Sequence, residues 1–233
     1  MREVPARHWT RRFGHVAVAA AFFGAGMVAA TTGVARADED EDDRSWLTRK
    51  SRVRDGLAPG LSLGVGFAGS SGYPNDVKLQ GKPDYYSSSD FLVGRTVTPH
   101  LMGALTDWFN FGFMLNLGTY SSAHWESTGG GAGVRFEVFP LWSRERNPAR
   151  NLGLYGQGGI GWGRLHNTTG DYPDADAVQS YIGAGAFHEI TVARWVSSHL
   201  ALGPYAQYDL VKADAFERHA LSLGLRTVWY GGR

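Results

Sequence analysis

Residues 221–230 read LSLGLRTVWY, a stretch in which apolar side chains occupy every second position. Its three leucines alternate with serine, glycine and arginine, and the stretch ends in aromatic residues. Because successive side chains of a strand point to opposite faces, a period of two predicts a β-strand with one apolar and one polar face.

The same alternation recurs earlier in the chain. Seven further segments lie near residues 61–67, 97–105, 111–117, 132–138, 152–162, 180–190 and 200–210. The segment 180–190 is the weakest of these, and its facing is ambiguous. After residue 60 no run is apolar enough, for long enough, to form a transmembrane helix. A chain of this kind enters a membrane only as a closed barrel, because lipid cannot satisfy an open sheet edge.

The connections and the tryptophans favour a membrane barrel over a soluble sandwich or a lipocalin-like barrel. Three connections lie on one side of the predicted barrel. Those near 107–110 and 193–198 are short, and the one near 143–151 is a basic segment. The alternate connections are longer or richer in loop residues, near 68–96, 120–129, 166–177 and 211–217. Outer-membrane barrels have short periplasmic turns and longer outer loops. With an even strand number, both termini lie on the periplasmic side.

Four tryptophans fall at the short-turn end and predict a periplasmic aromatic girdle: Trp108, Trp142, Trp195 and Trp229. Amphipathic rings prefer the boundary between water and lipid, whereas a soluble core would place them in mid-strand. Candidates for the opposite girdle are Tyr120, Trp162, Tyr181 and Tyr208.

The first 37 residues predict a signal peptide that is cleaved near Ala37. A basic start precedes an apolar stretch, Val16 to Val34, and the A-x-A site Ala35-Arg36-Ala37 follows. The alternative is an uncleaved anchor, since the apolar stretch approaches the ~20 residues that span a bilayer. Residues 38–59 are charged and predict a solvated periplasmic tail, with a tether to a partner or the cell wall as the alternative. Residues 60–230 then form the barrel.

The composition excludes several classes of protein. The 233 residues include 32 glycines, 13% aromatic residues and 19% charged residues, unlike a disordered chain. There is no cysteine, which excludes disulfides, thiolate metal sites and a lipid-modified N-terminal cysteine. Nothing indicates nucleic-acid binding, a cofactor or a metal.

This combination of leader, eight alternating segments, loop asymmetry and an aromatic-bearing last strand, His219–Tyr230, resembles the small outer-membrane barrels of the OmpA, OmpX and OmpW types. The resemblance covers residues 60–230. It implies an all-β, antiparallel, up-and-down transmembrane barrel in a Gram-negative outer membrane, porin-like in build and monomeric. It also implies contact with outer-membrane lipid and lipopolysaccharide, and with the assembly machinery. One departure is that Gly231-Gly232-Arg233 follow Tyr230, whereas such barrels commonly end on an aromatic residue.

The facing of the segments predicts a polar network of mixed charge inside the barrel. Its members are Arg135, Glu137, Tyr155, Gln157, Glu189, Tyr205, Gln207, Asp209 and Arg226. An eight-stranded barrel is just wide enough for side chains to fill it or for one small ligand. A plug of ion pairs and hydrogen bonds is the favoured interpretation, and a narrow path for a solute is the alternative. Strand glycines, such as Gly156 and Gly183, either relieve crowding or leave room for a lipid chain.

Two function classes follow from the sequence. One is a structural or surface-interaction barrel, whose long first loop, 68–96, would meet a partner; the other is a narrow channel for a small or amphiphilic solute. A lipid-modifying enzyme ranks last, and we predict no enzymatic activity. The candidate groups, His188-Glu189 and His124 beside Ser121, Ser122 and Glu126, lack a recognisable nucleophile arrangement. Three aspartates in one loop, Asp171, Asp174 and Asp176, lack the spacing of a calcium loop.

Overall fold

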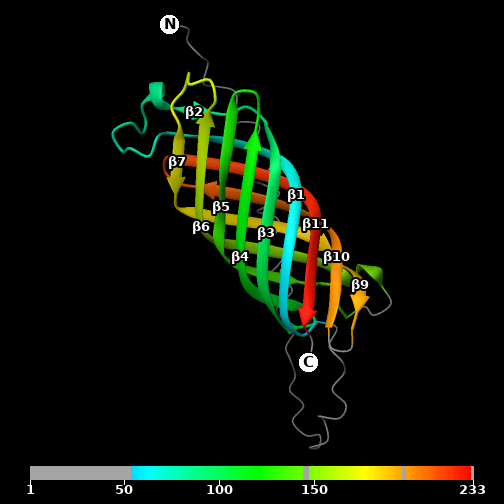
Figure 1. The fold of residues 1–233 in the computed structure, drawn as a ribbon. Helices are drawn as coiled ribbons and strands as arrows, with labels where there is room; N and C mark the ends of the chain where they lie inside the picture. Colours follow the sequence, from blue (N-terminus) through cyan, green and yellow to red (C-terminus); the bar gives the residue numbers. More distant parts are fainter. Residues whose placement is uncertain (1–53, 144–146, 196–197, 232–233) are drawn as a thin grey trace, which may run out of the picture. The chain divides into compact units, whose positions relative to one another are not determined.

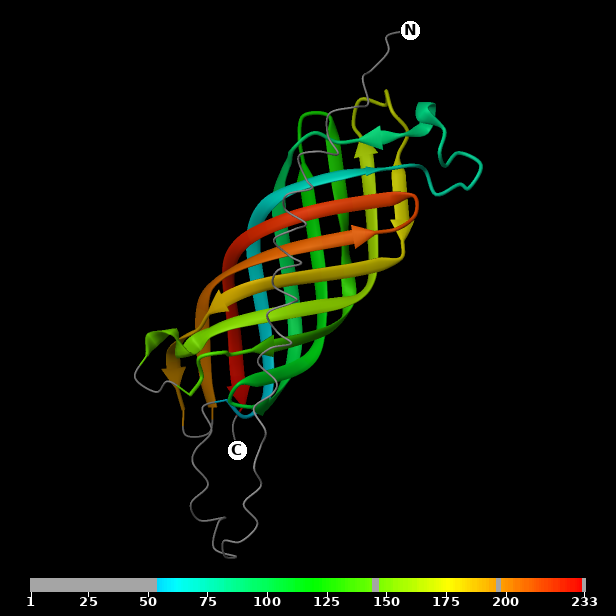
Figure 2. The same cartoon turned by 180° about the vertical axis from the view of Figure 1, so that it is seen from behind.

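Alternating side chains build an antiparallel sheet that closes on itself (Figures 1 and 2). The structure is a computed structural model, which describes residues 54–143, 147–195 and 198–231. The strands in these ranges are β1 (Gly56–Gly72), β2 (Ser87–Ser88), β3 (Leu92–Thr106), β4 (Phe109–Ser121), β5 (Trp125–Val138), β6 (Leu152–Asn167), β7 (Ala175–Val178), β8 (Ser180–His188), β9 (Ile190–Arg194), β10 (Ser198–Lys212) and β11 (Phe216–Gly231). Two short 3-10 helices, η2 (Pro83–Tyr85) and η3 (Pro148–Asn151), lie in the connections. No helix within the described ranges has the length and apolarity to cross a bilayer.

The barrel wall consists of eight antiparallel strand positions, which we call staves; seven are single strands and one is made of two consecutive strands. The last strand, β11, pairs with β10 on one side and with β1 on the other, which closes the sheet. Strands β8 and β9 both pair with β10, so they form one stave that is interrupted at Glu189. The predicted eight-stranded antiparallel barrel is therefore confirmed. The stave near 180–190 also acquires a definite facing, since Tyr181 and Phe187 point inward and Ile182 points outward.

The strands are longer than the alternation predicts. Strand β1 begins at Gly56, inside the predicted tail, while the predicted signal peptide and residues 38–53 lie outside the described residues. The predicted loops 120–129 and 211–217 contract to short turns, because pairing continues through Tyr120–Ser127 and Lys212–Glu217. Conversely, the connection between β5 and β6 on the other side is long. The contrast in loop length therefore depends mainly on the loop between β1 and β3.

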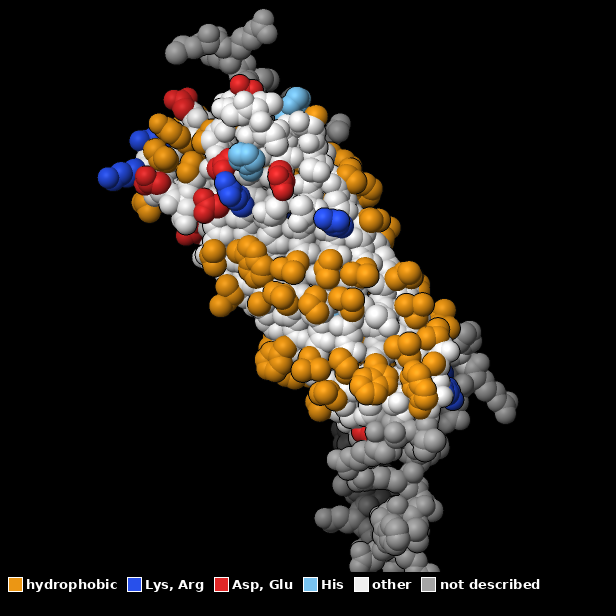
Figure 3. All heavy atoms as spheres, in the orientation of Figure 1, with side chains coloured by type: hydrophobic (Ala, Val, Ile, Leu, Met, Phe, Trp, Pro, Cys, Tyr) orange, Lys and Arg blue, Asp and Glu red, His pale blue; other side chains and the backbone are white. Residues whose placement is uncertain are grey.

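An apolar belt surrounds the barrel. Figure 3 shows bands of hydrophobic side chains across the wall, while charged side chains gather at the end that carries the long loop. Exposed members of the belt include Leu63, Val65, Phe67, Phe111, Phe113, Leu115, Ile160, Ile182, Leu221, Leu223 and Leu225. Water would strongly disfavour such a contiguous surface, whereas the hydrocarbon of a bilayer matches it. The barrel is thus a transmembrane one.

The aromatic residues divide between the two faces of the wall. Trp108, Trp142, Trp195 and Trp229 lie at the end opposite the long loop and are 42–57% exposed, as a girdle requires. At the other end Trp162 and Tyr208 face outward. Tyr120 and Tyr181 do not, since each is 1% exposed. Both tyrosines occupy positions that point into the lumen in the alternation of their strands, so the prediction that they face lipid was wrong.

Candidate functional site in the barrel interior

The inward positions of the wall carry the polar residues that the sequence singled out. All nine are at most 5% exposed: Arg135, Glu137, Tyr155, Gln157, Glu189, Tyr205, Gln207, Asp209 and Arg226. Their contacts run along one strand, between neighbouring strands or across the lumen. They fall into an ionic layer near the turn end and a polar layer in the middle.

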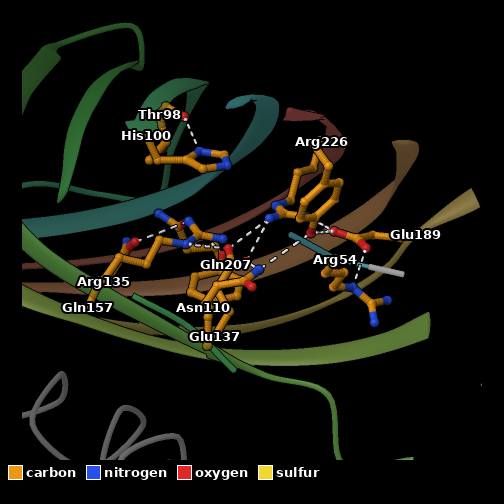
Figure 4. Close-up of polar contacts among 12 residues, drawn as sticks. Arg54, Thr98, His100, Asn110, Arg135, Glu137, Gln157, Glu189, Gln207 and Arg226 are labelled. Atoms are coloured by element: carbon orange, nitrogen blue, oxygen red, sulfur yellow. Dashed lines mark hydrogen bonds and ion pairs between the residues drawn. The ribbon is translucent and has the colours of Figure 1, made fainter. Parts of the chain in front are cut away.

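The ionic layer is centred on Arg226 of β11 (Figure 4). Its Nη2 donates to both carboxylate oxygens of Glu137 at 2.8 Å, and its Nη1 donates to Oε1 of Glu189 at 2.6 Å. Arg135 donates from Nε to Oε1 of Glu137 at 2.9 Å. Buried charges are tolerated when they are paired with good geometry and additional hydrogen bonds. The two carboxylates meet both conditions, whereas Nη2 of Arg135 and Nε of Arg226 have no hydrogen-bond partner among the described residues.

Three further residues complete this layer, and the sequence did not predict them. Arg54 donates from Nε to Oε2 of Glu189 at 3.2 Å and stacks 3.4 Å above the Phe139 ring. Asn110 donates to Glu137 at 3.0 Å, and Tyr230 donates to Glu189 at 2.7 Å. The inward phase of Asn110 and Tyr230 was available from the alternation. Arg54 had no such signal, because it lies in the charged stretch before the first strand.

Arg54 also closes the turn end of the lumen. Its backbone N–H donates to the Asp107 side chain at 3.0 Å, and its Nη1 donates to the Asp107 carbonyl at 3.0 Å. Its Nη2 reaches Oδ1 of Asn151 at 3.2 Å. One side chain therefore joins the start of β1 to the β3–β4 turn, to the segment before β6 and to Glu189.

The middle layer is held by Asp209. Its carboxylate accepts hydrogen bonds from Tyr181 and, at 2.7 Å, from Gln207. Gln207 accepts from Tyr155 at 2.7 Å, so β6, β8 and β10 are tied together. Tyr181 also accepts from Asn116 of β4 at 2.6 Å, which carries the layer across the lumen. Tyr205 lies apart, with its hydroxyl 3.3 Å from Thr96.

The outer third of the lumen is mainly apolar. A cluster of buried side chains lines it: Ala68, Leu92, Met114, Tyr120, Trp125, Leu165, Ala175, Ala177, Tyr181, Val211, Phe216 and Ala220. Ser70 of β1 and Ser127 of β5 bridge the lumen there at 2.7 Å. Glycines make room for the rings: a Cβ at Gly131 would lie 2.2 Å from Tyr181, and one at Gly163 would lie 2.2 Å from Phe216. At these positions strand glycine relieves crowding.

The structure does not bring the remaining candidate residues from the sequence together in one site. His188 and Glu189 occupy opposite faces of the wall, and Glu189 is engaged with Arg54 and Arg226. His124 lies in the tight turn before β5, and it is exposed. Asp171 accepts from Thr169 at 2.7 Å.

Asp174 forms an exposed ion-pair cluster at the outer end. Its carboxylate accepts from Arg164 at 2.7 Å and lies 2.6 Å from Nδ1 of His166. Partial burial of Asp174 opposes its ionisation, but the hydrogen bonds from Arg164 and His166 outweigh it and hold the pKa below its ordinary value. The Asp174 carboxylate is therefore already engaged by Arg164 and His166.

The closed eight-stave wall, its apolar belt and its filled polar lumen define a small transmembrane β-barrel of the outer-membrane type. No family model and no curated protein matches the chain. Solved structures of small outer-membrane barrels are similar to it.

Three of these structures illustrate the likeness. Ail of Yersinia pestis, in complex with the heparin analogue sucrose octasulfate, is 14% identical, with 75% of this chain and 99% of that chain covered and a TM-score of 0.41. Neisserial surface protein A is 13% identical, with 72% and 97% covered and a TM-score of 0.37. The outer membrane protein AlkL is 12% identical, with 82% and 96% covered and a TM-score of 0.35.

Proposed function

We propose that this protein is an outer-membrane barrel with a structural or surface-interaction role, and that its lumen does not conduct solute. The observation that carries the proposal is the filling of the lumen at successive levels. Arg226 bridges β11 to β5, Asn116 bridges β4 to β8, and the Ser70–Ser127 pair bridges β1 to β5. A solute on this path would have to separate buried charges or break buried hydrogen bonds, both of which are costly.

The outer connections support a role in surface interaction, because they hold one another in place. Ser87 donates to the Pro173 carbonyl, which joins the long loop to the β6–β7 loop. Tyr73 donates from its backbone to Ala215 at 2.7 Å, and Thr168 does so to His124 at 2.9 Å. All four outer connections are thereby linked into a preorganised platform, which lowers the entropy lost on binding.

The platform exposes side chains suited to recognition. Tyr85, Tyr86, Phe91 and Tyr172 are each 38–59% exposed. Aromatic side chains of this kind dominate binding energy at interfaces. We infer that a surface partner binds here, and that the barrel is a monomer delivered by the outer-membrane assembly machinery after cleavage near Ala37.

Exposed basic residues outside the wall favour contact with lipopolysaccharide. Arg95, Arg164 and Lys212 come from three different strands and point outward near their outer ends. Guanidinium and ammonium groups at this level match the phosphates of the outer leaflet.

Planar-bilayer recording tests the sealed lumen. The wild-type barrel is expected to give no reproducible unit conductance. A unit conductance that Arg135→Ala or Arg226→Ala abolishes would instead establish the narrow channel and refute the sealed barrel. Turnover of added phospholipid or lipopolysaccharide would show a barrel enzyme.

Vesicle binding tests the lipid contact. The triple variant Arg95→Gln, Arg164→Gln and Lys212→Gln is expected to lose association with lipopolysaccharide while it still inserts into phospholipid vesicles. Lys78→Gln with Lys82→Gln, in the long loop, is the matched control. Equal loss in both variants would refute a site on the wall.

A further inference from the structure

A buried arginine in the outer third of the lumen lacks the pairing that every other lumenal arginine described above has. Arg218 of β11 is 2% exposed, and among the described residues its Nε and Nη1 have no hydrogen-bond partner. The Tyr120 ring lies 5.9 Å from its guanidinium carbon, at the limit of a useful cation–π contact. Buried guanidinium N–H groups without an acceptor are costly, because they have lost their hydrogen bonds to water.

The surroundings of Arg218 supply further donors. Arg218 lies opposite Ser70 in the β1–β11 pairing, and Ser70 shares a hydrogen bond of 2.7 Å with Ser127 across the lumen. Two hydroxyls joined by one hydrogen bond have a second O–H left to donate. The wall facing the guanidinium is glycine: a Cβ built on Gly129 would lie 2.9 Å from Nη1. Guanidinium, hydroxyl and a bare backbone edge are all groups that face anions in proteins.

We propose that Arg218 is a binding site for a carboxylate that occupies the outer third of the lumen. A planar carboxylate matches the guanidinium fork and can accept from the N–H groups of Arg218 that have no partner. A dianion fits less well, because Asp209 follows on the same face of the wall, opposite Ala220 in the β10–β11 pairing. The apolar side chains around the site, such as Val211 and Phe216, exclude the water that would weaken the pair.

The carboxylate has two sources of identical chemistry. One is a free small carboxylate, for which formate is the probe. The other is the head of a fatty acid whose chain lies among the apolar residues, for which decanoate is the probe. The proposal does not depend on the proposed function, because a barrel that is closed at the levels of Arg226 and Asn116 can still exchange a ligand at its outer end.

The test uses the purified full chain in detergent micelles at constant ionic strength. Formate or decanoate replaces chloride stepwise, and the unfolding midpoint is followed by the heat-dependent gel shift. A ligand that binds only the folded state raises the midpoint with the logarithm of its concentration. We expect this rise in the wild type and in Arg95→Met, whose arginine faces outward, and no rise in Arg218→Met. Line broadening of ¹³C-formate provides a direct reading of binding in the same samples.

Each outcome decides the proposal. A rise with formate that requires Arg218 identifies a free carboxylate, and a rise with decanoate alone identifies a fatty-acid head. An equal response in wild type and Arg218→Met, or no response to either probe, overturns the site. If Arg218→Met does not fold, Arg218→Lys replaces it: a point charge without the fork is expected to bind formate at least tenfold more weakly.

Discussion

Replacement of Arg226 by methionine is expected to destabilise the barrel by about 3–5 kcal/mol, the cost of removing one partner from a buried ion pair. Arg226 has three close hydrogen bonds to carboxylates, two to Glu137 at 2.8 Å and one to Glu189 at 2.6 Å. The side chains of these glutamates are 0% and 7% exposed, so water cannot replace the lost donors. Methionine fills much of the volume and supplies no charge.

The remaining partners place the loss toward the lower end of that range. Glu137 keeps Arg135 and Asn110, and Glu189 keeps Arg54 and Tyr230. Each carboxylate therefore retains one arginine and one neutral donor.

Urea unfolding in lipid vesicles, followed by the heat-dependent gel shift, measures the change. The control is Arg164→Met, which removes an exposed ion pair with Asp174 and is expected to lower the free energy of unfolding by about 0.5 kcal/mol or less. A loss below about 1 kcal/mol for Arg226→Met would show that the ionic layer is hydrated, and it would refute the sealed lumen.

Three more expectations follow from the structure. Gly163→Ala is expected to cost about 1–3 kcal/mol, because its Cβ would lie 2.2 Å from the Phe216 ring, whereas Gly103→Ala, with its nearest neighbour at 3.7 Å, should be neutral in the same unfolding assay. Because the pKa of Asp174 is lowered in the folded state, the stability from its contacts is present above the ordinary pKa and is lost as the pH falls through the lowered one. Arg164→Gln should raise that pKa in a carboxyl NMR titration, and an unchanged value would contradict the contact. Cell fractionation should recover the protein in the outer membrane with a heat-dependent gel shift, and recovery in the soluble periplasm would contradict the barrel.

Alternation predicted the facing of the wall well, because a period of two leaves only two choices for each residue. Arg135 and Glu137 could be placed inside from their apolar neighbours alone. The same rule also applied to Tyr120 and Tyr181, but their aromatic character and position near the strand ends suggested lipid contact instead. Where the alternation and the residue type predicted different facings, the alternation was correct.

The parts that the sequence did not predict have a physical reason. Outside the bilayer a strand needs no apolar face, so the outer ends of β4 and β10 carry polar residues that are typical of loops. Arg54 precedes the first strand and therefore has no phase at all. Its place in the lumen depends on where β1 begins relative to Glu189, and this is a property of the closed barrel.

The ionic layer draws its charges from distant parts of the chain. Arg54 stands before the first strand, Glu137 on β5, Glu189 between β8 and β9, and Arg226 on the last strand. Arg54 precedes β1 and Arg226 lies on β11, the two strands that pair at the closing seam, so Glu189 has both of its arginine partners only in the closed barrel. Hydration of these charges opposes early drying of the lumen and favours an incomplete barrel that stays wet. We therefore expect closure of the final seam and expulsion of water from the lumen to occur together, since the ionic layer is complete only when both terminal strands are in place.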